Sequence, residues 1–265
     1  MLSAFLTPRG HDPLSRSTIN ASIRVSREVL ERLGIHLPAF AGWTPARWEN
    51  TGPEADEIRD CALGWDVTDF GSRKFHELGR TLFTMRNGLP LHKDARYPKP
   101  YAEKFLIEPE NQRSPIHYHL NKREDIINRG GGNVIVALHR IGQDGMPDAR
   151  GAAINASVDG VRRTFAAGEK IRLRPGESIA IPPSTFHQFW AEEGTGLRID
   201  GVGYTVSGEI STVCDDYNDN CFIDDWSARY PEIVEDEPRE TYLCNEYPRA
   251  TLKSAASPAR EMAAN

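Results

Sequence analysis

The stretch SPIHYHLNKREDIINRGGG, Ser114–Gly132, places two histidines, a lysine and a glutamate close together ahead of three glycines. If PIHYHL is a β-strand, its two-residue period sends His117 and His119 to the same face. Glu124 follows closely enough for a turn to bring its carboxylate beside the two rings, and Gly130–Gly132 permit a sharp reversal into the next strand. We therefore expect a hairpin whose polar face carries two imidazoles and a carboxylate.

A second stretch, PGESIAIPPSTFHQFW (Pro175–Trp190), has the pattern of a turn, a strand, a further turn and a strand that starts at His187. Neighbouring strands of a barrel would bring this ring opposite the first two. Together with His117, His119 and Glu124, His187 would then be a fourth side chain able to bind the same metal ion.

Short alternating runs extend outward from these stretches, beginning near Tyr101. They include EKFLIE, NVIVAL, KIRLRP and LRIDGVGYTV, with turn signals such as Asp159-Gly160 and Pro175-Gly176 between them. This spacing predicts a mainly β protein with an antiparallel sandwich or barrel.

The sequence on either side of the barrel lacks the alternating pattern of the strands. Residues 1–100 are expected to form a helical and aromatic arm, with an amphipathic helix over Ser17–Leu33 that Ser17 or Thr18 caps and Gly34 ends. Residues 101–214 would form the barrel, and residues 215–265 an irregular acidic extension with a loose tail. We expect all three parts to form one structural domain.

Composition excludes several classes of protein. Of 265 residues, 39% are hydrophobic and 26% charged, and 32 basic against 38 acidic residues give a net charge of −6. No dense basic run is present to follow phosphates, and no long uncharged apolar run is present to cross a bilayer, so neither nucleic acid nor membrane is an expected partner. With no signal-peptide pattern and four cysteines outside any CxxC spacing, we expect a cytoplasmic protein with reduced thiols.

The pattern HxHx4E, followed by Gx5P and a later histidine, resembles the two cupin motifs. Longer blocks look like the D-lyxose isomerase family, including GWDVTDFG, HYHLNKREDIINRGGGN, FHQFWAE and GEISTVCDDYNDNCF, which run from about Leu63 to Phe222. The resemblance implies a jelly-roll-like cupin barrel. Ser184 departs from the glycine usual in the second motif, and Cys214 and Cys221 depart from the residues expected in the acidic block.

Carried over to this chain, the resemblance makes His117, His119, Glu124 and His187 the metal ligands. Three imidazoles and one carboxylate leave two open positions on an octahedral ion, which suits Mn²⁺, Co²⁺, Fe²⁺ or Ni²⁺ better than a closed tetrahedral Zn²⁺ site. The resemblance favours Mn²⁺ among these ions. Asp125 is a candidate for orienting a ligand ring.

The implied reaction is aldose–ketose isomerisation of a free monosaccharide, D-lyxose to D-xylulose or D-mannose to D-fructose, through a cis-enediol. This reaction needs a base that moves a proton between C1 and C2, for which we expect Glu209, and a cation near the oxygens, for which we expect Lys122. Lys104, Trp190 and Asp216 are the expected substrate contacts. Cupins commonly pair their sheets, so a homodimer is expected.

Three rival interpretations stay open at this point. The same ligand set serves Fe²⁺-dependent dioxygenases, which have no need of a lysine and a glutamate beside the metal. A sugar-binding cupin without turnover would also carry the ligands. A phosphosugar isomerase would need an anchor for a phosphate, for which Arg162 and Arg163 are the candidates, although their place after a hairpin turn favours exposure.

Overall fold

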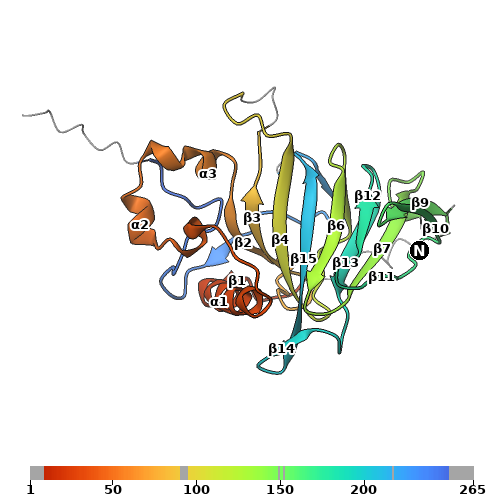
Figure 1. Ribbon diagram of the computed structural model, residues 1–265, viewed down its shortest axis with the longest axis horizontal. Helices are drawn as coiled ribbons and strands as arrows, with labels where there is room; N and C mark the ends of the chain where they lie inside the picture. The colour runs from red at the N-terminus through yellow and green to blue at the C-terminus, as the bar shows by residue number, and fades with distance from the viewer. Residues whose placement is uncertain (1–8, 90–94, 149, 152, 217, 251–265) are drawn as a thin grey trace, which may run out of the picture.

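The computed structural model describes residues 9–89, 95–148, 150–151, 153–216 and 218–250. Two antiparallel sheets face each other, and helices gather at one end of the larger sheet (Figure 1). The larger sheet has nine strands in the order β10-β9-β12-β6-β15-β4-β3-β2, with β14 added beside β15; the smaller has six in the order β11-β7-β13-β5-β16, with β8 added beside β7. The prediction of a mainly β, antiparallel fold is confirmed.

The larger sheet consists of β2 (Gly64–Thr68), β3 (Arg80–Arg86), β4 (Tyr101–Pro109), β6 (Glu124–Gly130), β9 (Ile154–Val158), β10 (Val161–Phe165), β12 (Ser178–Ile181), β14 (Leu197–Ile199) and β15 (Val202–Thr212). The smaller sheet consists of β5 (His117–His119), β7 (Val134–Ile141), β8 (Pro147–Asp148), β11 (Ile171–Leu173), β13 (Phe186–Ala191) and β16 (Asn220–Phe222). A short parallel pair joins β1 (Leu14–Ser15) to β17 (Ile233–Val234).

The helices are α1 (Arg16–Arg32), α2 (Pro45–Glu49) and α3 (Asp56–Asp60), with 3-10 turns η2 (Ala39–Gly42) and η3 (Pro53–Ala55). Helix α1 begins earlier than expected, because the side chain of Ser15 caps it by accepting a hydrogen bond from the Thr18 N–H. Gly34 ends it as predicted, at φ +68°, with Ile35 N–H bonded to the Leu30 carbonyl. None of the helices in the described ranges has the length and apolar character needed to span a bilayer.

Alternation along β3 and β4 of the larger sheet places neighbouring residues in two different clusters. On the outer face, Phe83, Ile107 and Val206 pack with Ile19 and Ile23 of α1 in one buried cluster. The inner face contributes another set to the core between the two sheets, including Leu82, Leu106 and Ile126 of the large sheet with Val136 and Phe189 of the small one. Charged inner residues take the place of this apolar core toward one end of the sandwich.

Two features of the strands differ from expectation. The run LRIDGVGYTV is two strands rather than one, because Asp200 and Gly201 both have positive φ, at 46° and 84°, and form the tight turn between β14 and β15. Strand β15 continues to Thr212, so Glu209 lies within it. Strands β2 and β3 also show that the chain before residue 101 adds two strands to the large sheet.

Candidate metal centre and active site

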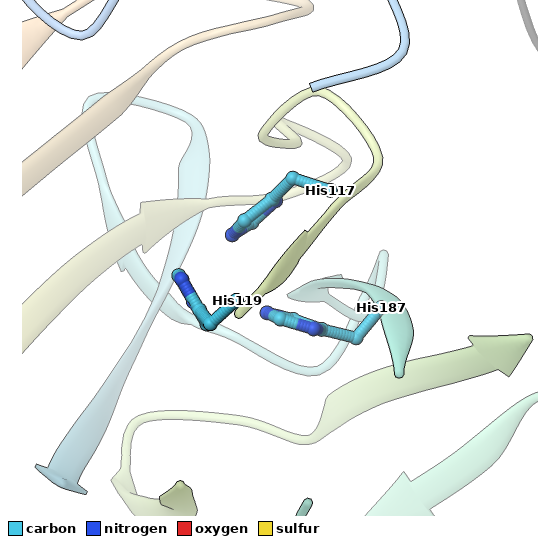
Figure 2. A group of neighbouring side chains, drawn as sticks. All are labelled: His117, His119 and His187. Atoms are coloured by element: carbon cyan, nitrogen blue, oxygen red, sulfur yellow. The ribbon is translucent and has the colours of Figure 1, made fainter. Parts of the chain in front are cut away.

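Three imidazoles converge from two neighbouring strands of the smaller sheet. His117 and His119 share a face of β5, and His187 of β13 pairs directly with His117 across the antiparallel ladder. The ring centroids are 4.4 Å apart for His117 and His187, 5.1 Å for His117 and His119, and 5.2 Å for His119 and His187. Figure 2 shows ring nitrogens of all three turned toward a common space, and one nitrogen from each ring lies within 4.8 Å of the other two.

The backbone fixes the tautomer of two of these rings. His117 Nδ1 lies 2.8 Å from the Pro115 carbonyl, and His187 Nδ1 lies 2.9 Å from the Thr185 carbonyl. A carbonyl oxygen only accepts, so Nδ1 donates in both rings and Nε2 keeps its lone pair. The carbonyl two residues before each histidine therefore does the orienting work that was expected of Asp125, whose side chain is exposed on the other face of β6.

Glu124, the first residue of β6, brings a carboxylate from the opposite sheet to the three rings, which we call the imidazole group. Its Oε1 lies 2.9 Å from His187 Nε2, and its Oε2 lies 3.6 Å from His119 Nε2. Glu124 Oε1 and His187 Nε2 are both buried, and neither forms a hydrogen bond of good geometry with the described residues. A carboxylate oxygen and a ring nitrogen that lie this close in a buried place are suited to share a cation.

The charges of these groups suit a divalent metal ion. Burial, followed by the proximity of His187, lowers the pKa of His117 well below its usual value, and burial with the Lys122 charge lowers the pKa of His119. Burial acts to raise the pKa of Glu124, but the Lys122 ammonium and the nearby imidazoles outweigh it and hold that pKa well below the usual range. Neutral imidazole and ionised carboxylate are the forms that bind metals, so the donor set fits the expected cofactor.

Lys122 joins the imidazole group to a second set of side chains. Its Nζ lies 2.6 Å from Glu124 Oε2 and 2.9 Å from Glu209 Oε1. Lys104 faces Glu209 across the ladder between β4 and β15, with Nζ 3.7 Å from Glu209 Oε1, 3.7 Å from Asp216 Oδ1 and 2.8 Å from Cys214 Sγ. We call Lys104, Lys122, Glu209 and Asp216 the charged wall.

Burial and mutual contact set the protonation of Lys104, Lys122 and Asp216. Burial acts to lower the pKa of both lysines, but the carboxylates beside them outweigh it, so the pKa of Lys122 is well above its usual value and that of Lys104 is also raised. Burial acts to raise the pKa of Asp216, while Lys104 and Arg229 bring it below the usual range. Ammonium and carboxylate therefore coexist beside the imidazole group.

A cavity between the two sheets brings most of the predicted residues together. The imidazole group, Glu124 and the charged wall all line it, with further residues that the sequence did not single out: Phe70, Arg80, Leu82, Leu106, Ser114, Phe189, Asn220, Phe222 and Arg229. Trp190 does not line it. Trp190 is an odd number of residues from His187, so it occupies the other face of β13, where Arg113 stacks 3.9 Å from its ring.

Two aspartates of the acidic block have different roles: Asp219 stabilises a turn, and Asp216 lines the cavity. The Asp219 carboxylate accepts hydrogen bonds from the N–H groups of Asn121 and Lys122, at 2.7 and 2.9 Å, and so holds the turn between His119 and Glu124. Asp216 enters the cavity, and Cys214 Sγ lies 3.0 Å from its Oδ1. A thiol therefore lies between Lys104 and Asp216, where the sequence had suggested a departure from the family.

The two other unusual positions affect the surroundings of the site. Cys221 lies between Asn220 and Phe222 on β16, and unlike them it does not line the cavity. Ser184 has φ +57°, a left-handed conformation in which glycine is less strained, and its N–H donates to the His119 carbonyl at 2.8 Å. The sequence difference at Ser184 thus concerns turn geometry.

Comparison with known proteins identifies the family of this chain. The D-lyxose isomerase family matches residues 14–247. The D-lyxose/D-mannose isomerase of Serratia proteamaculans is 45% identical over 235 residues, which cover 88% of this chain and 97% of that protein. The D-lyxose/D-mannose isomerase of Escherichia coli O157:H7 is 44% identical over 88% of this chain and 98% of its own length.

Solved structures extend the likeness to the fold. The L-ribose isomerase of Geodermatophilus obscurus superposes with a TM-score of 0.54 at 16% identity, over 85% of this chain and all of that one. The L-ribose isomerase of Cellulomonas parahominis bound to L-psicose gives 0.53 at 14% identity, over 85% and 100% of the two chains. The predicted cupin-type fold is confirmed, and the family match over residues 14–247 shows that the chain belongs to the D-lyxose isomerase family.

Proposed function

We propose that this protein interconverts D-lyxose and D-xylulose, and D-mannose and D-fructose, by proton transfer through a cis-enediol. Two curated relatives at 44–45% identity are named D-lyxose/D-mannose isomerases. The observation that carries the proposal is the position of Lys122, whose Nζ lies 2.6 Å from Glu124 Oε2 and 2.9 Å from Glu209 Oε1 in a buried cavity. Lys122 thus connects Glu124, the proposed metal ligand, to Glu209, a carboxylate able to act as a base.

His117, His119, His187 and Glu124 would hold a divalent ion, Mn²⁺ in the first place and Co²⁺, Fe²⁺, Ni²⁺ or Zn²⁺ as alternatives. Such an ion supplies Lewis acidity toward adjacent sugar oxygens, which makes the neighbouring C–H more acidic. The chain's own contribution is to lower the pKa of His117 and His119 by burial, which keeps those two rings neutral, and to fix His117 and His187 by their Nδ1–H bonds to carbonyls.

Glu209 is the proposed base. All the hydrogen bonds and ion pairs that it forms with the described residues use Oε1, which is held by Lys122 at 2.9 Å, Ser211 Oγ at 3.1 Å and Lys104 at 3.7 Å. Its Oε2 is left to take the proton from C2 of the aldose and return it to C1. The ketose forms when a second proton also passes from O2 to O1. The fixed carboxylate needs little rearrangement during the transfer.

Lys122 is the proposed partner of the sugar oxygens. Its ammonium is 4% exposed, and burial strengthens its interaction with negative charge that develops on an enediolate. An ammonium there donates a hydrogen bond to the oxygen while Glu209 holds the carbon-derived proton. Lys104 and Asp216 are the proposed contacts for other sugar hydroxyls.

The rivals have less support. A phosphosugar isomerase would need a cationic anchor, and Arg162 and Arg163 are exposed on β10, outside the residues that line the cavity. The charged wall is unlike the apolar surroundings that an O₂-dependent cupin would favour. A homodimer and a cytoplasmic location remain predictions from the sequence.

The proposal is tested by incubating Mn²⁺-reconstituted protein with D-lyxose, D-mannose, D-xylulose and D-fructose in D₂O and following the products by NMR. We expect ketose from each aldose, with solvent deuterium on the carbon that receives the proton. Complete retention of the substrate hydrogen in the product would indicate a hydride shift instead of the proposed proton transfer. An absence of turnover with all four sugars, together with oxygen uptake, would favour the dioxygenase.

A further inference from the structure

Arg229 comes from the segment after β16 and reaches the cavity between two anchors. Its side chain, 9% exposed, forms an ion pair through Nη2 with Asp66 of β2, and its Nε lies 3.6 Å from Asp216 Oδ2. The Thr68 hydroxyl donates to the Arg229 carbonyl at 3.0 Å, which fixes the backbone as well. The guanidinium therefore has one orientation set by several contacts.

One nitrogen of this guanidinium is not used by any of these contacts. Nη1 is buried and has no hydrogen-bond partner among the described residues, while Arg229 lines the cavity. A buried N–H donor without an acceptor costs about 1–3 kcal/mol, and more for a charged group. A guanidinium held rigidly with one unsatisfied nitrogen at a cavity wall is suited to receive an oxygen from a ligand.

Two series of side-chain contacts along the cavity connect the imidazole group with Arg229. Along one, polar contacts run from Glu124 through Lys122 and Glu209 to Lys104 and Asp216. Asp216 then contacts Arg229.

The second series is aromatic. Ring centroids are 5.5 Å apart for His117 and Phe222 and 5.9 Å apart for Phe222 and Phe70, and the guanidinium carbon of Arg229 lies 5.9 Å from the Phe70 centroid. Both series of contacts therefore end at Arg229, away from the imidazole group.

Charge balance decides which oxygen Arg229 receives. The Arg229 guanidinium already faces two carboxylates, because it pairs with Asp66 through Nη2 and its Nε lies 3.6 Å from Asp216 Oδ2. A phosphate bound by Nη1 would add two negative charges beside these carboxylates. A neutral hydroxyl adds none.

We propose that Arg229 is a substrate-binding residue that donates from Nη1 to a hydroxyl of the open-chain sugar remote from C1 and C2. This inference rests on the proposed isomerase function. A hydrogen bond from a charged donor contributes about 1.5–3 kcal/mol, which corresponds to roughly 10- to 150-fold in affinity. Because the contact is remote from the reacting carbons, its loss falls mainly on KM.

Arg229→Lys tests the contact, since lysine keeps a positive charge near Asp66 and Asp216 but lacks the second nitrogen. We expect KM for D-lyxose to rise about 10- to 150-fold, with kcat changed by less than about fivefold. With 4-deoxy-D-lyxose or 5-deoxy-D-lyxose, whichever lacks the bonded hydroxyl, the KM values of wild type and variant should converge. Arg162→Lys, on the exposed face of β10, is the matched control and should leave all these values unchanged.

Two results would overturn the inference while the isomerase proposal stands: an unchanged KM for D-lyxose in Arg229→Lys, or the same rise in KM for D-lyxose and both deoxy sugars, which would indicate a purely structural role. If wild type turns over neither D-lyxose nor D-mannose, the proposed function fails instead. If the variant does not fold, wild-type crystals soaked with D-xylulose decide the matter. Nη1 within hydrogen-bond distance of a C4 or C5 hydroxyl supports the contact, and its absence refutes it.

Discussion

The imidazole group and the charged wall lie in one cavity but are built in different ways. His117, His119 and His187 lie on adjacent strands of the smaller sheet, and two of them are oriented by a carbonyl two residues earlier. The charged wall is assembled from separate strands and the acidic block, and its members are positioned mainly by one another. Local backbone geometry therefore organises the side proposed to bind the metal, while long-range ion pairs organise the side proposed to transfer the proton.

The largest effect should come from removing a ring of the imidazole group. His187→Ala should weaken metal binding by more than about 100-fold, because even residues that only orient metal ligands contribute about 10- to 100-fold. Turnover should then be undetectable at stoichiometric metal. Metal content after dialysis measures the loss of affinity, with His76→Ala, at an exposed histidine, as the control. Full metal occupancy in His187→Ala would remove His187 from the ligand set.

The charged wall should respond differently. Glu209→Gln keeps the size of the side chain but removes the base, so kcat should fall by about 100- to 10,000-fold while the metal stays bound. Steady-state kinetics and metal content on the same sample separate the two effects, with the exposed Glu193→Gln as the matched control. Retained turnover in Glu209→Gln would assign the proton transfer to another group.

Lys122 belongs to both sides, which makes its replacement informative. Lys122→Met should lower kcat by about 100-fold, the usual cost of one donor to a developing oxyanion. The same change should tighten metal binding, because the ammonium 2.6 Å from Glu124 Oε2 competes with a metal for that carboxylate. Titration calorimetry with Mn²⁺, against Arg123→Met as a control, measures this; weaker binding in Lys122→Met would show that the lysine supports the metal instead.

The smallest effect concerns pH and the metal-free protein. His117 and His119 have lowered pKa values, so the unfolded chain binds more protons than the native one below about pH 6.5. The free energy of unfolding should therefore fall as the pH decreases from 7.5 to 5.5, by up to about 1.4 kcal/mol per pH unit for each ring. Urea unfolding at a series of pH values should show a shallower slope for His119→Asn than for His36→Asn, whose side chain is exposed; equal slopes would contradict this.

Local patterns predicted much of the fold and of the imidazole group. Alternation placed His117 and His119 on one face, and the second motif started a strand at His187. The same rule, applied fully, would have placed Phe189 rather than Trp190 beside His187, since residues two apart share a face. The Asp200-Gly201 turn was likewise present in the sequence as a hairpin signal that the long run LRIDGVGYTV obscured.

The remainder depends on contacts that no local pattern records. Arg229 and Asp66 are far apart in the chain, and neither lies in a motif that predicts an ion pair. Asp219 looked like a member of a solvated acidic loop, yet its carboxylate holds the backbone of the turn after His119. The start of α1 was misplaced because Ser15, Ser17 and Thr18 all suit an N-cap and tertiary contacts choose among them.

Anomalous diffraction from a Mn²⁺-loaded crystal, measured on both sides of the manganese absorption edge, tests the central claim most directly. The account predicts a single strong peak among Nε2 of His117, Nε2 of His187, a ring nitrogen of His119 and the Glu124 carboxylate, with two coordination positions open to the cavity. A peak elsewhere, or an ion closed off from the cavity by protein ligands alone, would contradict it.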